Sequence, residues 1–460
     1  MGMAAQERFW TPMNLDWRGR VYGVPSFNFQ SRDRVRALFL FADGEPIGEE
    51  GLYWLKVHVA NCGNFEGEDF IKVSKWPFAE RVRWVHENLE KIESTVAAPL
   101  RELWWTKADK PFQFLAACFQ LSSALAQGPT FVSRLPISFD GSCSGLQHLS
   151  AMTRDEKTAK LVNLTPQVVP QDIYQTIADR VRQRVDGDIE CYDDTHLAQM
   201  WFKEGIDRKA VKRNVMTYVY GSSSWGMAEQ QLEDLMRPLA DKVKRGKLKE
   251  HPFGEDKGAA AAKYIAQIIY STIEKVAKRP AAAMKFLQLL AAAMADEGLY
   301  LQWTTPAGFP WANRYYTQKT KQVRLYLHNL GVSFRVLLTT GEEEPKIDRR
   351  KANNGVAPNF VHACDAAHLM RTVNAAVAEG ITSIATVHDS FGCLPSRAGR
   401  FRKIIREEFV RMYEEHDVLA QVLNQARADL SGNTKRMPSA PPEYGSLDLK
   451  KVLDAEFAFA

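Results

Sequence analysis

The sequence contains 460 residues, 45% of them hydrophobic and 11% aromatic, which excludes a disordered chain and a single small domain. Its 60 lysines and arginines against 55 aspartates and glutamates permit a polyanionic partner without requiring one. The six scattered cysteines include no CxxC pair, so we expect a reduced chain without structural zinc.

Neither a signal peptide nor a membrane span is predicted. The N-terminal MGMAAQERF has no apolar core, and the longest apolar stretch, residues 281–295, includes Lys285 and is typical of a buried helix. We therefore expect no membrane partner and a cytoplasmic location.

The first half of the chain is predicted to be largely helical. Residues 46–127 have a helical pattern, and residues 135–139 form a short apolar run that ends in Asp-Gly-Ser. Such a run is typical of a buried strand that enters a turn. Helical periodicity dominates again from residue 171 to residue 235.

The second half adds short strands. An exposed loop is predicted around the cations Lys242, Lys244, Arg245, Lys247 and Lys249. Two helices are predicted to flank Pro280. Alternating residues between 301 and 338 predict a hairpin, and residues 381–394 predict a second one with His388 and Asp389 at its turn.

The first segment that can carry chemistry is ISFDGSCSGLQH, residues 137–148. A buried strand that ends in Asp140 would aim this carboxylate at a metal ion, and Gly141 would let the backbone approach the same ion. The alternative, in which Asp140 only caps the following helix, is the commoner interpretation of such a segment by itself.

The second segment is TVHDSFG, residues 386–392. An aspartate at the tip of an apolar hairpin, here Asp389, is held rigidly beside water. Ordinary turn chemistry is the alternative, because Asp and Ser are favoured turn residues.

The third segment is RKAVKRNVMTYVYG, residues 208–221. Arg208 and Lys212 are four residues apart and share one helix face, and Tyr220 follows close to that face. Two cations and a phenol along one stripe suit a nucleoside triphosphate. The alternative is an ordinary basic amphipathic helix, because three valines at positions 211, 215 and 219 form a separate apolar stripe.

Residues 141–145, GSCSG, also favour a different enzyme class. They are similar to the nucleophile elbow of α/β-hydrolases, with Cys143 in place of serine and His388 downstream. A cysteine hydrolase is therefore an alternative, but it leaves the helix at residues 208–221 unexplained. The sequence contains neither a GxxxxGK[ST] loop nor an HExxH motif, which excludes P-loop ATPases and zincins.

In combination, a carboxylate, a cationic helix and a second carboxylate on a hairpin follow the order of polymerases with a right-hand fold. At these strings the sequence closely resembles the single-subunit RNA polymerases of phages and mitochondria. The resemblance extends to DWRGRVY (16–22), YWLKVHVANC (53–62), APNFVHACDAAHL (357–369) and the terminal EFAFA, and so covers nearly the whole chain.

The resemblance implies an α+β, mostly helical right-hand polymerase fold, with palm and fingers but without the family's N-terminal domain and thumb. It divides the chain into successive segments: palm (1–44), a helical palm insertion (45–130), palm with the first metal aspartate (131–156), fingers (157–362) with a promoter-specificity hairpin at about 307–345, and palm with the second metal aspartate and a C-terminal foot (363–460).

For the site, the resemblance implies DNA-templated RNA synthesis with two Mg²⁺ ions on Asp140 and Asp389, and with the carbonyl of Gly141 as a further ligand. Lys212 and Arg208 would neutralise the triphosphate, and Lys212 would also protonate the leaving group. Other family positions around the incoming nucleotide are Tyr174, Arg213 and His388.

The preference for ribose can also be predicted. Related DNA polymerases carry a glutamate five residues after the first metal aspartate, where this chain has Gly145, leaving room for a 2′-hydroxyl. Tyr220 and His362 match the residues that sense this hydroxyl and the minor-groove edge of the nascent pair. A DNA polymerase of the same fold and an inactive nucleic-acid-binding scaffold are the alternatives.

The expected partners are template DNA, nascent RNA and ribonucleoside triphosphates. Arg18 and Arg20 lie in the family's nucleic-acid-contacting turn, and the hairpin with Arg324, Tyr326 and Arg335 resembles the loop that reads promoter bases.

Family members carry several hundred residues before the DWRGR turn, whereas the terminal EFAFA resembles a complete C-terminus. A core fragment is one explanation. We favour the other: the large subunit of a split phage polymerase, whose smaller partner supplies the thumb and N-terminal domain in the cytoplasm of an infected bacterium.

Overall fold

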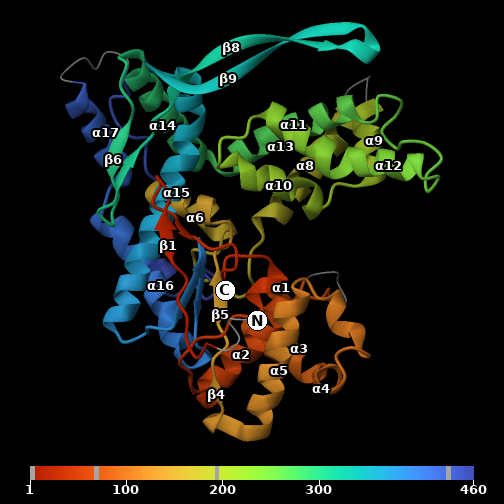
Figure 1. Ribbon diagram of the computed structural model, residues 1–460, viewed down its shortest axis with the longest axis vertical. Helices are drawn as coiled ribbons and strands as arrows, with labels where there is room; N and C mark the ends of the chain where they lie inside the picture. Colours follow the sequence, from red (N-terminus) through yellow and green to blue (C-terminus); the bar gives the residue numbers. More distant parts are fainter. Residues whose placement is uncertain (1–5, 67–71, 192–195, 431–436) are drawn as a thin grey trace.

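The computed structural model describes residues 6–66, 72–191, 196–430 and 437–460. Within these ranges helices predominate, and the strands form small antiparallel sheets (Figure 1). This confirms the prediction of a mostly helical α+β chain. None of the helices in these ranges combines the length and apolar character needed to cross a bilayer.

Two groups of helices can be followed in Figure 1. The lower part of the view and its left side contain α1 (Asp33–Arg36), α2 (Gly48–Gly63), α3 (Phe78–Glu87), α4 (Leu89–Ala97), α5 (Pro111–Gln127), α6 (Ser144–Met152), α7 (Glu156–Leu161), α14 (Lys278–Asp296), α15 (Arg349–Ala378), α16 (Ala398–Glu415) and α17 (Val418–Asp429). The upper right contains α8 (Ile173–Cys191), α9 (His196–Glu204), α10 (Arg208–Tyr218), α11 (Ser224–Gln231), α12 (Arg237–Lys244) and α13 (Ala259–Val276).

Short helical segments lie between or after these elements: η2 (Val73–Lys75), η3 (Leu103–Lys107), η4 (Gly128–Thr130), η6 (His328–Leu330), η7 (Pro395–Arg397), η8 (Leu449–Val452) and the π-helical η5 (Leu232–Met236).

The central sheet has the strand order β10 (Ile384–Val387), β11 (Ser390–Cys393) and β5 (Ile137–Asp140). Both neighbouring pairs are antiparallel, and Asp140 lies opposite Ser390. The predicted buried strand and the predicted hairpin at residues 381–394 are thus confirmed. The register brings together two segments about 250 positions apart in the sequence.

The C-terminal residues pair with the end of β5, the strand that carries Asp140. Gly141 forms an isolated antiparallel bridge with Phe459, and the Ala460 amide donates a hydrogen bond to the Asp140 carbonyl over 3.1 Å. Phe457 and Phe459 are buried, and this burial fixes the end of the chain against β5.

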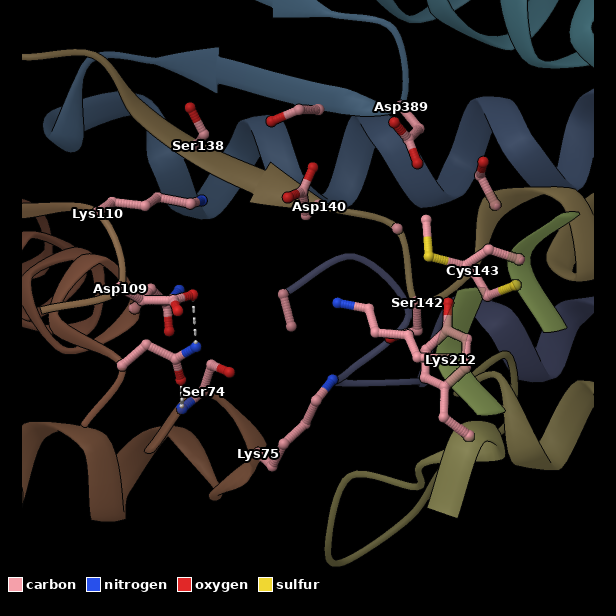
Figure 2. Close-up of a pocket in the computed structure, with 18 of the residues that line it drawn as sticks. Ser74, Lys75, Asp109, Lys110, Ser138, Asp140, Ser142, Cys143, Lys212 and Asp389 are labelled. Atoms are coloured by element: carbon pink, nitrogen blue, oxygen red, sulfur yellow. Dashed lines mark hydrogen bonds between the residues drawn. The ribbon is translucent and has the colours of Figure 1, made fainter. Parts of the chain in front are cut away.

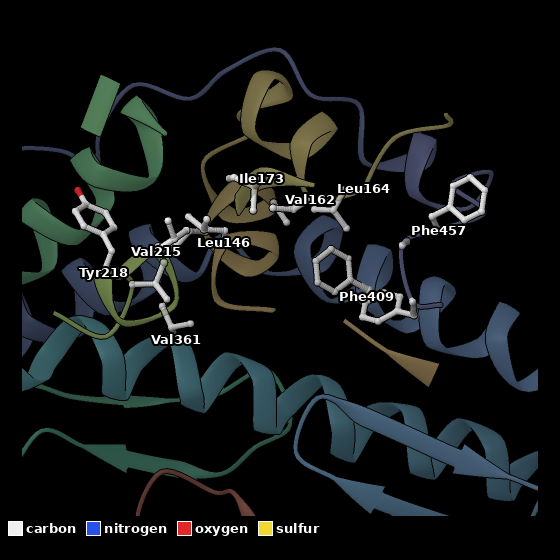
Figure 3. Close-up of a cluster of buried hydrophobic side chains, with 14 of the residues drawn as sticks. Leu146, Val162, Leu164, Ile173, Val215, Tyr218, Val361, Phe409 and Phe457 are labelled. Carbon is white, nitrogen blue, oxygen red and sulfur yellow. The ribbon is translucent and has the colours of Figure 1, made fainter. Parts of the chain in front are cut away.

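A continuous core joins the two groups of helices. Figure 3 shows Val215 and Tyr218 of α10 near Leu146 of α6 and Val361 of α15. All four side chains are buried, and each contributes about 1.5–3 kcal/mol by leaving water. The C-terminal half of α10 is therefore packed against the part of the molecule that contains the central sheet.

The remaining strands form hairpins or pairs: β1 (Met13–Leu15) with β2 (Val21–Gly23), β3 (Glu45–Pro46) with β4 (Val132–Ser133), β6 (Gln302–Thr304) with β7 (Pro310–Ala312), and β8 (Tyr316–Leu327) with β9 (Val332–Ile347). The β8–β9 pair is a long ribbon that extends over α11 and α13 in Figure 1. It confirms the hairpin predicted in this part of the chain.

Two local predictions were wrong. The basic segment is not all loop, because α12 continues to Lys244 before the chain turns. Pro280 does not separate two helices; it lies within the first turn of α14, where the missing N–H has no helical partner to lose.

The predicted division of the chain into palm and fingers segments stays a prediction. One of its boundaries, at residue 362, falls inside α15, which runs without a break from Arg349 to Ala378. A single helix therefore connects the two predicted segments on either side of that boundary.

Candidate functional site

A cavity of about 370 Å³ lies between the end of the central sheet, helices α2 and α5, and helix α10 (Figure 2). The sheet side supplies Asp140 and Asp389, and the opposite side supplies cations. A volume of this size is within the usual range for a small-molecule site.

The two aspartates lie side by side because of the strand register. Asp140 ends β5 opposite Ser390, and Asp389 immediately precedes Ser390 in the β10–β11 turn. The backbone amide of Gly141 approaches the carbonyl of Asp389 to 3.4 Å. His388, the first turn residue, has a φ of +54°, a left-handed backbone that a two-residue hairpin turn requires.

The environment of Asp389 disfavours its charge. Burial, followed by the nearby charges of Asp365 and Asp140, raises the pKa of Asp389 to about 7, while a hydrogen bond from Ser144 acts in the opposite direction. Crowded carboxylates of this kind are stabilised when a cation lies between them.

The donor set fits magnesium. Two carboxylates supply hard oxygen ligands, and Mg²⁺ is commonly held by one or two carboxylates together with water and substrate phosphates. Among the described residues, no group of three or more His, Cys, Asp or Glu side chains could hold a metal ion, so any further ligands would have to be of other kinds. The Gly141 carbonyl accepts a hydrogen bond from the Cys143 amide over 3.1 Å and keeps one lone pair for a further partner.

Helix α10 presents a stripe to the cavity. Arg208, Lys212 and Met216 are spaced four residues apart, and Tyr220 follows just beyond the helix; all four line the cavity. Asp207 caps the helix by accepting from the Ala210 amide over 2.8 Å. The predicted apolar stripe is also present, since residues 211, 215 and 219 are buried. The helix thus has a cationic face towards the cavity and an apolar face towards the core, and binding of a triphosphate by the first face stays a prediction.

Sequence reasoning missed two lysines of the same cavity. Lys75 of η2 and Lys110 before α5 both line it, and Figure 2 shows Lys75 and Lys212 pointing into the same space. Burial lowers the pKa of Lys75, and burial followed by the neighbouring Arg208 lowers that of Lys212. Lys75 lies in a short turn without periodicity, so no sequence pattern pointed to it.

Arg208 is oriented by its neighbours. Its Nε donates to Asp172 over 2.6 Å, and its guanidinium lies 5.0 Å from the ring centroid of Tyr174. Tyr174 lines the cavity, and its place beside the incoming nucleotide stays a prediction. Asp172 also accepts from the Tyr174 amide over 2.9 Å, so one carboxylate both starts α8 and holds Arg208.

Tyr220 lines the cavity and contacts His362, which lies behind it outside the cavity lining, with ring centroids 4.6 Å apart. Burial raises the pKa of Tyr220 to about 12, so its hydroxyl stays a donor. Burial also lowers the pKa of His362 to about 3, so this ring is neutral, and its Nδ1 lies 3.1 Å from Arg18 Nη1. The resemblance placed Tyr220 and His362 at one site, although they are 142 positions apart in the sequence.

Gly145 lines the cavity, but the space in the direction of a Cβ is occupied. A Cβ built on Gly145 would lie 2.7 Å from the Val219 side chain and 3.7 Å from that of Val361. The missing side chain therefore lets the end of α10 pack against α6. A glutamate here would have to displace Val219 before it could reach a sugar.

Arg20 lies in the interior, whereas the resemblance implies a contact with nucleic acid. Its Nη2 pairs with Asp365 over 2.6 Å, with only 12% and 3% of the two side chains exposed. Burial alone would raise the pKa of Asp365, but hydrogen bonds and charges from His148 and Arg20 together lower it below its usual range. This geometry supports a structural role for Arg20.

The substitution Arg20→Gln is expected to destabilise the fold by about 3–5 kcal/mol at neutral pH, because it leaves the buried Asp365 carboxylate without its partner. The contribution of the pair is present above the usual aspartate pKa and lost as the pH falls. The difference from wild type should therefore stay constant near neutral pH and shrink as the pH falls below about 4, the usual aspartate pKa, towards the lowered pKa of Asp365. Urea unfolding at several pH values measures this.

Arg8→Gln is the matched control, because Arg8 pairs with Asp43 over the same 2.6 Å in an exposed position. It should cost less than about 1 kcal/mol. Equal effects of the two substitutions would contradict the assignment of Arg20 to the interior.

Several other predicted site residues lie outside the cavity. Arg213 pairs with Asp234 over 2.6 Å and Glu233 over 3.2 Å, because it is one position round the helix from Lys212. The ring of His388 packs on Tyr22 at 4.9 Å. Roles for these two residues at the nucleotide stay predictions that the geometry does not support.

The three hairpin residues lie on the β8–β9 ribbon. Arg324 and Arg335 are register partners on opposite strands, and the Arg324 guanidinium lies 5.1 Å from the Tyr326 ring centroid. They do not line the cavity, and their contact with promoter bases stays a prediction.

The hydrolase alternative lacks an activated nucleophile. Burial raises the pKa of the Cys143 thiol, so it is not a thiolate at neutral pH. His388 packs on Tyr22, and its Nδ1 has no hydrogen-bond partner among the described residues. A cysteine nucleophile would need a lowered pKa and a base within reach.

Two carboxylates that suit a hard cation thus face the cationic side chains of α10, which suit a triphosphate. This arrangement defines a candidate phosphoryl-transfer site. Residues 45–439 match the family described as DNA-dependent RNA polymerase, and the chain belongs to this family. The family was correctly identified from the sequence.

Three relatives illustrate the match. The chain is similar to T7 RNA polymerase of Escherichia phage T7, with 38% identity over 99% of this chain and 54% of the relative. The DNA-directed RNA polymerase of Enterobacteria phage T3 is 39% identical over the same shares. The mitochondrial DNA-directed RNA polymerase of Mus musculus is 31% identical over 98% of this chain and 37% of the relative. The chain thus spans about half the length of the phage relatives.

Proposed function

We propose that this chain carries out DNA-templated RNA synthesis by nucleotidyl transfer from ribonucleoside triphosphates. The observation that carries the proposal is the cavity in which Asp140 and Asp389 face Arg208, Lys212 and Lys75. Membership of the DNA-dependent RNA polymerase family supports the same reaction.

The proposed reaction assigns a role to each side of the cavity. Asp140 and Asp389 would hold two magnesium ions, which supply the charge that activates the RNA 3′-hydroxyl and stabilises the departing pyrophosphate. Arg208, Lys212 and Lys75 bind the triphosphate oxygens and set the orientation of the α-phosphate. The 3′-oxygen forms a bond to the α-phosphorus and its proton passes to water, while the bond between the α-phosphorus and the pyrophosphate oxygen breaks. Lys212, whose pKa is lowered, delivers a proton to that departing oxygen.

The test is extension of an RNA primer on a DNA template with magnesium, with ribonucleotides and deoxyribonucleotides offered separately. Ribonucleotide incorporation that stops when magnesium is chelated supports the proposal. Preferential incorporation of deoxyribonucleotides would instead identify a DNA polymerase of the same fold, and template binding without any incorporation would identify an inactive scaffold.

We assign the choice of ribose to Tyr220, supported by His362. A protonated phenol at the end of the cavity can donate to a 2′-hydroxyl, and its contact with the neutral His362 ring restricts its position. Packing of Val219 against Gly145 keeps this end of α10 close to α6.

Tyr220→Phe is expected to lower the discrimination between ribonucleotides and deoxyribonucleotides about tenfold, since one hydrogen bond of roughly 1.4 kcal/mol is lost from the correct substrate. The measurement is kcat/KM for both sugars. Tyr22→Phe is the matched control, because Tyr22 lies next to His388 and does not line the cavity. An unchanged ratio for Tyr220→Phe would remove Tyr220 from sugar selection.

We further propose that a second, smaller protein chain completes the enzyme, and that both act in the cytoplasm of an infected bacterium. The support is that the phage relatives are about twice as long as the matched region. The proposal predicts that the isolated chain extends a primed RNA–DNA hybrid poorly and does not start on a duplex promoter. Processive transcription from duplex promoters by this chain alone would refute it.

We also propose that the β8–β9 ribbon contacts promoter DNA through Arg324, Tyr326 and Arg335. A two-stranded ribbon can enter the major groove, where arginine is the usual partner of guanine. The exposed Tyr326 side chain is available for such a contact.

A further inference from the structure

A second groove lies between α8 and α13, away from the candidate catalytic cavity, and has a volume of about 470 Å³. No residue lines both spaces. The groove is lined by three cations and four neutral residues: Arg180, Arg184, Lys275, Gln267, Ile268, Ser271 and Thr272. Among the described residues, no carboxylate lines it.

The charge of the groove is only partly compensated. Arg180 and Lys275 are exposed and form no ion pair with any described residue, whereas Arg184 pairs with Asp188 over 3.0 Å. The other Asp188 oxygen accepts from the Tyr264 hydroxyl over 2.9 Å. The nearby Asp179 pairs with Arg182 over 3.3 Å.

The cations stand on both walls of the groove. Arg180 and Arg184 are one helical turn apart on α8, about 6 Å from each other. Lys275 lies near the end of α13 on the opposite wall. Helices α8 and α13 pack against each other, and both contribute buried residues such as Val181 and Ile269. This packing fixes the distance between the two sides of the groove.

Helix α8 contributes side chains to both the catalytic cavity and the groove. Helix α8 begins beside that cavity, which Tyr174 lines. Arg180 is six residues further along, a rise of about 9 Å. Fewer than two turns of α8 therefore separate a residue of the catalytic cavity from a residue of the groove.

We propose that this groove binds the phosphodiester backbone of single-stranded DNA next to the segment held in the catalytic cavity, an inference that rests on the proposed function. Guanidinium groups bind phosphate oxygens in pairs, and hydroxyl and amide groups such as those of Ser271, Thr272 and Gln267 add neutral donors. Free pyrophosphate carries the same kind of phosphate oxygens and is therefore the alternative ligand of the groove.

The test compares two triple variants with the same change in charge. Arg180→Gln/Arg184→Gln/Lys275→Gln neutralises the groove, and Arg101→Gln/Lys403→Gln/Lys450→Gln neutralises three exposed cations elsewhere. Binding of a fluorescent single-stranded DNA is measured by anisotropy at several salt concentrations. Pyrophosphate binding is measured by calorimetry, and magnesium-dependent primer extension is recorded on the same preparations.

The groove variant should reduce the slope of log affinity against log salt by about 2, at roughly 0.7 for each lost phosphate contact, while the control keeps the wild-type slope. An unchanged slope in the groove variant would overturn the inference. The inference would also be overturned if the groove variant lost pyrophosphate binding but still bound DNA like the wild type. Absence of RNA synthesis by the wild type would count against the proposed function alone, because the salt slope is measured without catalysis.

Discussion

Replacing Asp140 or Asp389 by asparagine is expected to slow RNA extension by a factor of about 10³ or more, equivalent to roughly 4 kcal/mol of transition-state stabilisation. The reason is that both carboxylates would hold the magnesium charge at the reacting phosphate. Asparagine keeps the shape of the side chain but cannot supply a negative oxygen. Single-turnover extension of a primed template at saturating nucleotide measures the effect.

The fold should survive these substitutions. Because the pKa of Asp389 is raised to about 7, its carboxyl is partly neutral near physiological pH without a cation, and a neutral amide of the same size replaces it at little cost. The thermal midpoint of Asp389→Asn should therefore equal or exceed that of the wild type in the presence of a chelator.

Asp109→Asn is the matched control for the aspartate variants. Asp109 lines the same cavity but pairs with Lys72 over 2.9 Å on the far side from the sheet. Its removal should change the extension rate by less than about fivefold, in line with an exposed ion pair of up to about 1 kcal/mol. A loss of less than tenfold in Asp140→Asn would contradict the catalytic assignment.

Lys212→Ala is expected to lower kcat about 10²-fold and to raise KM for the nucleotide, because a cation that binds the triphosphate and donates a proton is lost. Lys212→Arg separates the two roles. Arginine keeps the positive charge but does not release a proton, so KM should recover while kcat stays low. Steady-state kinetics with varied nucleotide concentration measure both constants.

Lys209→Ala is the matched control for this series. Lys209 is on the same helix, is exposed and does not line the cavity. Its removal should leave both constants within about twofold, since an isolated surface charge contributes little. Full recovery of kcat in Lys212→Arg would show that Lys212 acts through its charge only, and would contradict proton donation.

The sequence by itself determined the local elements and the types of side chain that carry chemistry. Apolar runs predicted β5 and the β10–β11 hairpin, and the four-residue spacing of Arg208 and Lys212 placed both cations on one helix face. The family could also be predicted, because motif strings are contiguous and are read without knowledge of contacts.

Only the tertiary structure decided which of these residues meet. Lys75 enters the cavity from a short turn that has no periodicity, and Arg20 faces the buried Asp365, a partner 345 positions away. Val219, which directly follows α10, occupies the space where a Cβ of residue 145 would lie, and Arg213 points away from Lys212 towards acidic partners. Spacing along the chain fixes which side chains share a face, whereas the packing of one element against another determines what that face meets.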